Sequence, residues 1–155
     1  QFFMNATTIE VDHDVVAAAL ALCGDQPGIA CILGTGSNSC YFDGRSIHEN
    51  NYGLGYIMGD EGSGSYFGKK LITQYLYDML PVAIRTAFEA RFTMNKEIMI
   101  ENVYKKPGAN KWLASFAAFY SQFPENDWVQ RTVRQGFSEF LENCVCHYPD
   151  FVITA

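Results

Sequence analysis

The chain lacks a strongly basic segment. Its 155 residues include 11 Lys and Arg against 17 Asp and Glu, which gives a formal net charge of −6 at pH 7. Adjacent basic residues occur only as the pairs Lys69-Lys70 and Lys105-Lys106. Proteins that bind nucleic acids cluster Lys and Arg on the surface that meets the phosphates. We therefore expect no nucleic-acid partner.

Long apolar runs are also missing. No run approaches the roughly 18–20 apolar residues that a membrane-spanning helix needs. The first four residues, Gln1-Phe2-Phe3-Met4, have neither the basic flank nor the length of a secretory signal peptide. We expect a cytoplasmic protein with no membrane partner. An apolar content of 48% is enough for one well-formed core in a chain of this length.

The cysteines show no CxxC spacing and are odd in number, which argues against both a zinc site and a disulfide framework. The five cysteines are Cys23, Cys31, Cys40, Cys144 and Cys146. Most lie in apolar patterns, so we expect buried cytosolic thiols. The run Cys144-Val145-Cys146-His147 has a one-residue spacing that differs from the spacing of zinc ligands, and we expect no metal bound by protein side chains.

The first half of the sequence predicts a sheet with a helix beside it. β-branched residues favour a strand from Ala6 to Val11. The apolar body 15–22 then predicts a helix that Asp12-His13-Asp14 opens and Gly24 ends. The apolar run Gly28–Leu33 predicts a second strand. These elements form a strand–helix–strand unit.

A glycine hairpin follows, with Ser39–Phe42 as the antiparallel partner strand and Asp43-Gly44 as the next turn. Together with the preceding unit it predicts a mixed sheet. The segment Asn51–Gly55 is expected to be a glycine loop. From Ser63 onwards, apolar residues recur at helical spacing as far as Met79.

The rest of the chain is predicted to be mostly helical. The expected helices cover residues 82–92, 95–104, 110–121 and 127–147. The last of them carries a continuous apolar stripe that is typical of a core face. Residues 151–154 read as the start of another strand, so we expect the sequence to be a piece of a longer protein.

Two clusters of small polar residues stand out as a candidate site. The first is Gly34–Asn38, between two strands, and the second is Gly59–Gly64, directly before a helix. Glycines let backbone N–H groups approach phosphate oxygens, while Thr, Ser, Asn and Asp side chains bind hydroxyl groups. The first cluster alone is also ordinary turn chemistry.

Asp14, at a helix start after a strand, is either an N-cap or a general base.

Residues Gly28–Asn38 (GIACILGTGSN) and Gly53–Ser63 (GLGYIMGDEGS) resemble the N-acetylglucosamine kinases of the BadF/BadG/BcrA/BcrD ATPase family. That family belongs to the actin-like ATPase and sugar kinase superfamily. The resemblance implies an α/β fold with ribonuclease H-like lobes. It makes 1–25 the end of the N-terminal lobe and 26–155 a partial C-terminal lobe, with strands at 28–48 and a helical region at 63–147.

The resemblance also implies residue roles. For the phosphates of ATP, with Mg²⁺, it indicates Gly34, Thr35, Gly36 and Ser37. For the sugar it indicates Asn38, Gly53, Gly55, Asp60 and Gly62. The catalytic base would be Asp14, because the alanine-rich helix begins immediately after it, and Asp12 is the rival.

The implied reaction is the ATP-dependent phosphorylation of an amino sugar, N-acetylglucosamine, to its 6-phosphate. The family's first phosphate loop and adenosine segment have no counterpart in the sequence, so we expect this chain alone to be inactive. An ATPase activator of 2-hydroxyacyl-CoA dehydratases and a non-catalytic sugar-binding module are the alternatives. A homodimer is a further possibility, because the aromatic-rich stretch 112–123 can serve as core or interface.

Overall fold

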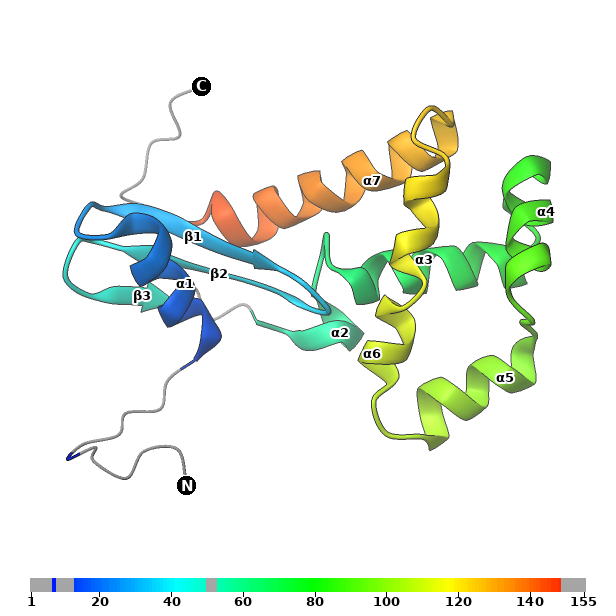
Figure 1. Ribbon diagram of the computed structural model, residues 1–155, viewed down its shortest axis with the longest axis horizontal. Helices are drawn as coiled ribbons and strands as arrows, with labels where there is room; N and C mark the ends of the chain where they lie inside the picture. The colour runs from blue at the N-terminus through cyan, green and yellow to red at the C-terminus, as the bar shows by residue number, and fades with distance from the viewer. Residues whose placement is uncertain (1–6, 8–12, 50–52, 149–155) are drawn as a thin grey trace.

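The computed structural model describes residue 7 and residues 13–49 and 53–148. A three-stranded sheet lies at one end, a group of helices at the other, and helix α7, Asp127–Phe140, runs between the two (Figure 1). The α/β class is therefore confirmed. The strands predicted at 6–11 and 151–154 lie outside the described residues, so the mixed sheet and the ribonuclease H-like topology stay predictions.

Helix α1, Asp14–Cys23, begins and ends where the sequence indicates. Gly24 ends it with φ 59°, a left-handed conformation that glycine adopts at little cost. The N-cap position belongs to His13, whose side chain makes no capping hydrogen bond. Asp14 is therefore the first residue of the helix, and its interpretation as an N-cap is wrong.

The sheet is antiparallel, in the order β1-β2-β3. Strand β1, Gly28–Leu33, has its predicted bounds, while β2 is Ser37–Phe42 and β3 is Ile47–Glu49. Leu33 pairs with Ser37, so the hairpin turn contains only residues 34–36. The predicted start of β2 at Ser39 was two residues late, because the polar residues 37 and 38 continue the strand pairing.

Each face of the sheet is covered by a different helix. Ala30 and Cys40, which are cross-strand partners, are fully buried against α1 in one small apolar cluster. On the opposite face, the Ser39 hydroxyl donates to the carbonyl of Cys144 at 3.1 Å and lies 3.1 Å from the Tyr148 hydroxyl. The sheet is therefore the middle layer between α1 and the end of the long C-terminal helix (Figure 1).

Two helices follow the sheet. Helix α2, Gly55–Met58, begins at the last residue of the segment that was expected to be a loop. Helix α3 covers Gly64–Leu76, and the Ser63 hydroxyl caps it by accepting from the N–H of Tyr66 at 3.2 Å. It ends before Met79, because the chain turns at Asp78 with φ 59°.

Some of the remaining α-helices continue directly into π-helical turns. In chain order they are α4 Val82–Arg91, α5 Lys96–Ile100, the π-helical turn η1 Glu101–Lys105, α6 Ala109–Ala114, the 3₁₀ turn η2 Ala117–Gln122, α7 Asp127–Phe140 and the π-helical turn η3 Leu141–Val145. At the end of α6 the Ser115 hydroxyl donates back to the Trp112 carbonyl at 2.7 Å, a local bond that competes with the helical pattern.

The main core joins α3 to the helices that follow it. Leu71, Ile84, Phe88 and Phe119 are nearly or fully buried in it. The apolar stripe of α7 is only partly core, since Val129 is buried but the exposed fraction of Phe137 is 40%. Aromatic residues 112–123 contribute mostly to the core.

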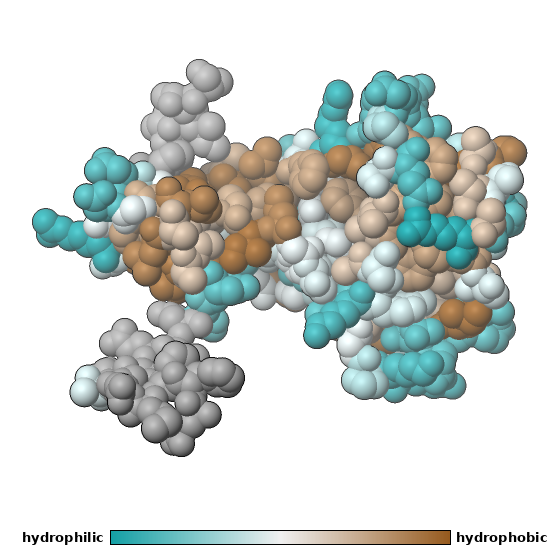
Figure 2. Space-filling model, in the orientation of Figure 1, coloured by the Kyte–Doolittle hydropathy of each residue, from teal (hydrophilic) through white to brown (hydrophobic). Residues whose placement is uncertain are grey.

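Apolar side chains also reach the surface near the sheet (Figure 2). Exposed fractions are 54% for Leu20, 70% for Leu22 and 47% for Leu33. The expectation of buried thiols is correct for Cys40 and wrong for Cys146, which is exposed. Within the described ranges, no helix has the length and apolar character needed to cross a bilayer.

The packing of α3 on α6 predicts that Gly68→Ala destabilises the full-length protein by about 3 kcal/mol or more. Alanine normally favours a helix over glycine by about 1 kcal/mol. Here its Cβ would lie only 1.8 Å from the Leu113 carbonyl oxygen, a backbone atom that cannot move alone. Urea unfolding measures the effect. The control is Gly34→Ala, whose Cβ meets nothing within 4 Å, and equal losses for both variants would contradict the prediction.

Candidate functional site

The two glycine clusters meet in the structure. The backbone N–H of Gly64 donates to the carbonyl of Gly34 at 2.8 Å, and the N–H of Ser65 donates to the carbonyl of Thr35 at 3.0 Å. The turn of the β1–β2 hairpin is thereby fixed to the first residues of α3. The sequence predicted two polar clusters, and these bonds bring them together into one site.

This contact changes how an anion can bind. The first N–H groups of a helix have no partner within the helix and often bind phosphate. In α3, two of these groups already donate to the hairpin turn, and Ser63 accepts from a third, that of Tyr66. Any phosphate near this site would therefore lie against the hairpin turn itself.

The hairpin turn has the open surface that such a ligand requires. The side chain of Thr35 is exposed, and a Cβ on Gly34 would meet no other atom within 4 Å. The Ser37 hydroxyl oxygen is buried and has no hydrogen-bond partner among the residues that the structure describes. Asn38 is engaged locally, since its Oδ1 accepts from the N–H of Ser39 at 2.9 Å.

Asp60 lies against the turn. A Cβ on Gly36 would lie 2.7 Å from Oδ2 of Asp60, so glycine at position 36 leaves room for this carboxylate where it lies. Asp60 itself has φ 59°, a left-handed conformation that is uncommon for a residue with a side chain. Partial burial raises its pKa, the neighbouring Glu61 adds to this, and a backbone hydrogen bond from Ser37 together with the charge of Lys69 opposes it.

The other glycines have different surroundings. Gly53 and Gly55 are exposed, with no atoms within 4 Å of a Cβ on either one. Gly62 is buried, and a Cβ there would lie 3.2 Å from the carbonyl oxygen of Gly136 in α7. Close packing on α7 is therefore sufficient to explain glycine at position 62, and its role towards a sugar stays a prediction.

Asp14 lies apart from these contacts. It is exposed at the first turn of α1, and α1 packs on β1 and β2. Within residues 13–49 and 53–148, no hydrogen bond or ion pair joins Asp14 to the hairpin turn or to Asp60. Asp12 lies outside the described residues. The choice between Asp14 and Asp12 as the base stays a prediction.

Two polar contacts in this region could not be predicted from the sequence. The ammonium group of Lys69 donates to the carbonyls of Tyr56 at 3.0 Å and Ile57 at 3.5 Å. The side-chain amide of Asn143 donates to Oε1 of Glu61 at 3.2 Å. No local pattern signals either contact, because each joins residues that only the tertiary fold brings together.

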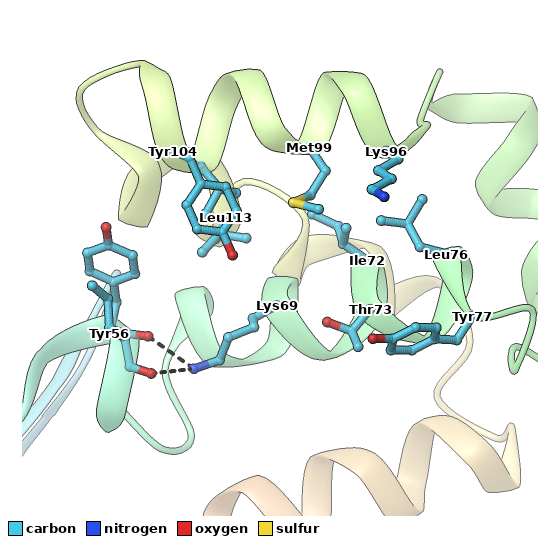
Figure 3. A pocket seen from close by; sticks show the side chains of 12 residues that line it. Tyr56, Lys69, Ile72, Thr73, Leu76, Tyr77, Lys96, Met99, Tyr104 and Leu113 are labelled. Atoms are coloured by element: carbon cyan, nitrogen blue, oxygen red, sulfur yellow. Dashed lines mark hydrogen bonds between the residues drawn. The ribbon is translucent and has the colours of Figure 1, made fainter.

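A cavity of about 640 Å³ lies beside α2, between α3 and the α5–η1 helix (Figure 3). Its size is in the usual range for small-molecule pockets. The lining is apolar and aromatic and contains two lysines, Lys69 and Lys96, but no carboxylate among the residues described around it. Tyr56 contributes to the wall, so the cavity borders α2 on the side where Lys69 holds it.

Comparison with known proteins identifies the relatives of this chain. It is similar to the crystal structure of a candidate N-acetylglucosamine kinase from Porphyromonas gingivalis, with 46% sequence identity and a TM-score of 0.82. The similarity covers 87% of this chain and 48% of that one, so this chain spans about half the length of that relative. The resemblance to N-acetylglucosamine kinases is therefore confirmed in both sequence and structure.

A second solved structure, a candidate N-acetylglucosamine kinase from Chromobacterium violaceum, shares 22% identity with a TM-score of 0.45, over 81% of this chain and 47% of that one. No family model matches the chain, and no curated protein matches it.

The surroundings of Asp60 predict that Asp60→Asn stabilises the full-length protein at pH 7. A raised pKa means that the folded state favours the protonated carboxyl, and that stabilisation is lost as the pH rises through the raised pKa. At pH 7 the ionised carboxylate therefore costs stability that a neutral amide does not. The gain should shrink as the pH falls through the raised pKa and should be gone below 3.8, the ordinary pKa, where both side chains are neutral.

Thermal unfolding midpoints measured at pH 7 and at a pH below 3.8 give this difference. The matched control is Asp25→Asn, at an exposed aspartate in the turn before β1. A lower midpoint for Asp60→Asn at pH 7, or a gain that is the same at both pH values, would contradict the prediction.

Proposed function

We propose that the full-length protein containing this chain is an ATP-dependent sugar kinase that phosphorylates N-acetylglucosamine on its 6-hydroxyl. The observation that carries the proposal is the 46% identity over 87% of the chain to the P. gingivalis protein, together with the docking of the two glycine clusters. The activity belongs to the whole protein, because the relative is about twice as long as the matched part.

On the phosphate side, the hairpin turn formed by residues 34–36 would face the nucleotide. The open space at Gly34 admits a phosphate oxygen close to the backbone, and the exposed Thr35 hydroxyl is a donor beside it. The orphan hydroxyl of Ser37 is a third polar group at this end of β2. These features fit the phosphate-binding role assigned to Gly34, Thr35, Gly36 and Ser37.

Mg²⁺ would neutralise phosphate charge during the transfer. Within the part of the chain that the structure describes, no group of three or more His, Cys, Asp or Glu residues could hold a metal ion. In this proposal the ion is held mainly through the phosphates of ATP.

On the sugar side, the half-buried carboxylate of Asp60 would accept hydrogen bonds from sugar hydroxyls. Gly36 and the N–H of Ser37 fix its position, so the carboxylate is oriented before a sugar arrives. Asn38 lies two residues from this turn. The exposed glycines 53 and 55 leave room for a sugar ring to approach the chain before α2.

Asp14 would act as the general base. In the reaction it would accept the proton of the 6-hydroxyl as that oxygen attacks the γ-phosphorus in line. Asp14 lies at the first turn of α1. Rate acceleration would come mainly from the positioning of both substrates and from charge neutralisation.

The proposal predicts that the full-length protein releases ADP with N-acetylglucosamine and that Asp14→Asn reduces kcat about 10²–10⁴-fold, the usual value of a general base. Asp25→Asn, at the other end of α1, is the control. If Asp12→Asn reduces kcat and Asp14→Asn does not, the general base is Asp12. ATP hydrolysis that is indifferent to every sugar would favour the dehydratase-activator alternative, and sugar binding without turnover would favour a binding module.

A further inference from the structure

Helix α2 has little apolar anchorage, since Tyr56 is the one residue of the helix that packs against the main core, and it is only partly buried. The helix is four residues long, and none of its residues is buried. The exposed fractions of Ile57 and Met58 are 69% and 74%. A helix this short is not stable alone and needs tertiary contacts to persist. Its position therefore depends on the packing of Tyr56 and on polar contacts.

Lys69 supplies the main polar contact. Its side chain extends from α3 along the cavity wall and its ammonium group reaches two carbonyls of α2 (Figure 3). The last carbonyls of a helix lack partners within the helix and carry the negative end of its dipole. A lysine is suited to both needs, since it donates up to three hydrogen bonds and carries positive charge.

The two ends of α2 connect to the proposed sugar side of the site. The exposed glycines 53 and 55 precede or begin the helix, and Gly59 and Asp60 follow it directly. The N–H of Gly59 donates to the Gly55 carbonyl at 2.8 Å, so the exit from the helix is continuous with it. A displacement of α2 would therefore move both sugar-facing segments.

We propose that Lys69 is a positioning residue for the sugar side of the site: by holding the carbonyls of Tyr56 and Ile57 it fixes α2, and with it the segments 53–55 and 59–60. The effect of Lys69 on catalysis rests on the proposed function. Its attachment to α2 does not, because the structure shows both hydrogen bonds. In this role Lys69 acts through α2, whose carbonyls it binds.

The charge of Lys69 adds a second effect on the same side of the site. The charged or titratable groups that act on Asp60 are Glu61, which disfavours its ionisation, and Lys69, which favours it; the Cys144 thiol also lies within electrostatic reach. Removal of the lysine charge should raise the pKa of Asp60 further. In the proposed function the ionised carboxylate binds sugar hydroxyls. The acid limb of the pH profile, where kcat/KM for the sugar falls as the pH is lowered, should then move to higher pH.

Hydrogen exchange tests the attachment without any need for activity. In the full-length protein, Lys69→Met should increase the exchange rate of amides 55–60 about tenfold, the equivalent of one charge-assisted hydrogen bond. Lys69→Arg should restore much of the protection, because arginine keeps both the charge and the donors. The matched control is Lys70→Met, a neighbouring lysine that lies over the Tyr66 ring instead of reaching α2.

Kinetics test the effect on the site. For Lys69→Met we expect the KM for the sugar to rise about tenfold with little change in the KM for ATP, and the acid limb to move upward; Lys70→Met should match the wild type. Unchanged exchange in amides 55–60 would overturn the attachment. Faster exchange with an unchanged sugar KM and pH profile would overturn the positioning role. If the full-length protein is inactive with every sugar, only the proposed function is contradicted. The hydrogen-exchange result then still tests whether Lys69 holds α2.

Discussion

The arrangement of the site depends on two backbone hydrogen bonds, from the N–H groups of Gly64 and Ser65 to the carbonyls of Gly34 and Thr35. They connect the only sheet in the described part of the chain to the first turn of α3, and so connect the two hydrophobic clusters. They also satisfy N–H groups that would otherwise lack partners at a helix end. The same contact that stabilises the junction places the hairpin turn beside Asp60.

The site also shows the cost of holding a carboxylate in position. Asp60 adopts a left-handed backbone conformation, is half-buried and lies next to another acid, Glu61. The backbone conformation is uncommon for a residue with a side chain, and burial beside another acid disfavours the ionised carboxylate. The compensating groups are the backbone of Ser37 and the charge of Lys69, while Gly36 leaves the space. Proteins commonly accept such local cost where a side chain has a task other than stability.

The sequence predicted the local structure well and the contacts between distant segments poorly. Strand β1 and helix α1 agree with prediction, because an apolar run, a helix-opening acid and a stopping glycine are local signals. The start of β2 and the existence of α2 were missed, since strand pairing extends through polar residues and a tertiary bond from Lys69 supports a four-residue helix in which no residue is buried. The motifs identified both halves of the site, but only the fold shows that they are bonded to each other, and the roles of Asp14 and the glycines stay predictions.

The most direct test of the account is a titration of the full-length protein with N-acetylglucosamine, followed by the backbone amide resonances of residues 34–38 and 59–64. If the two clusters form one sugar-binding site, resonances in both segments should shift together with a single dissociation constant, because a bonded pair of loops responds to the ligand as a unit. Shifts confined to one segment, two different dissociation constants, or no shift at saturating sugar would contradict it.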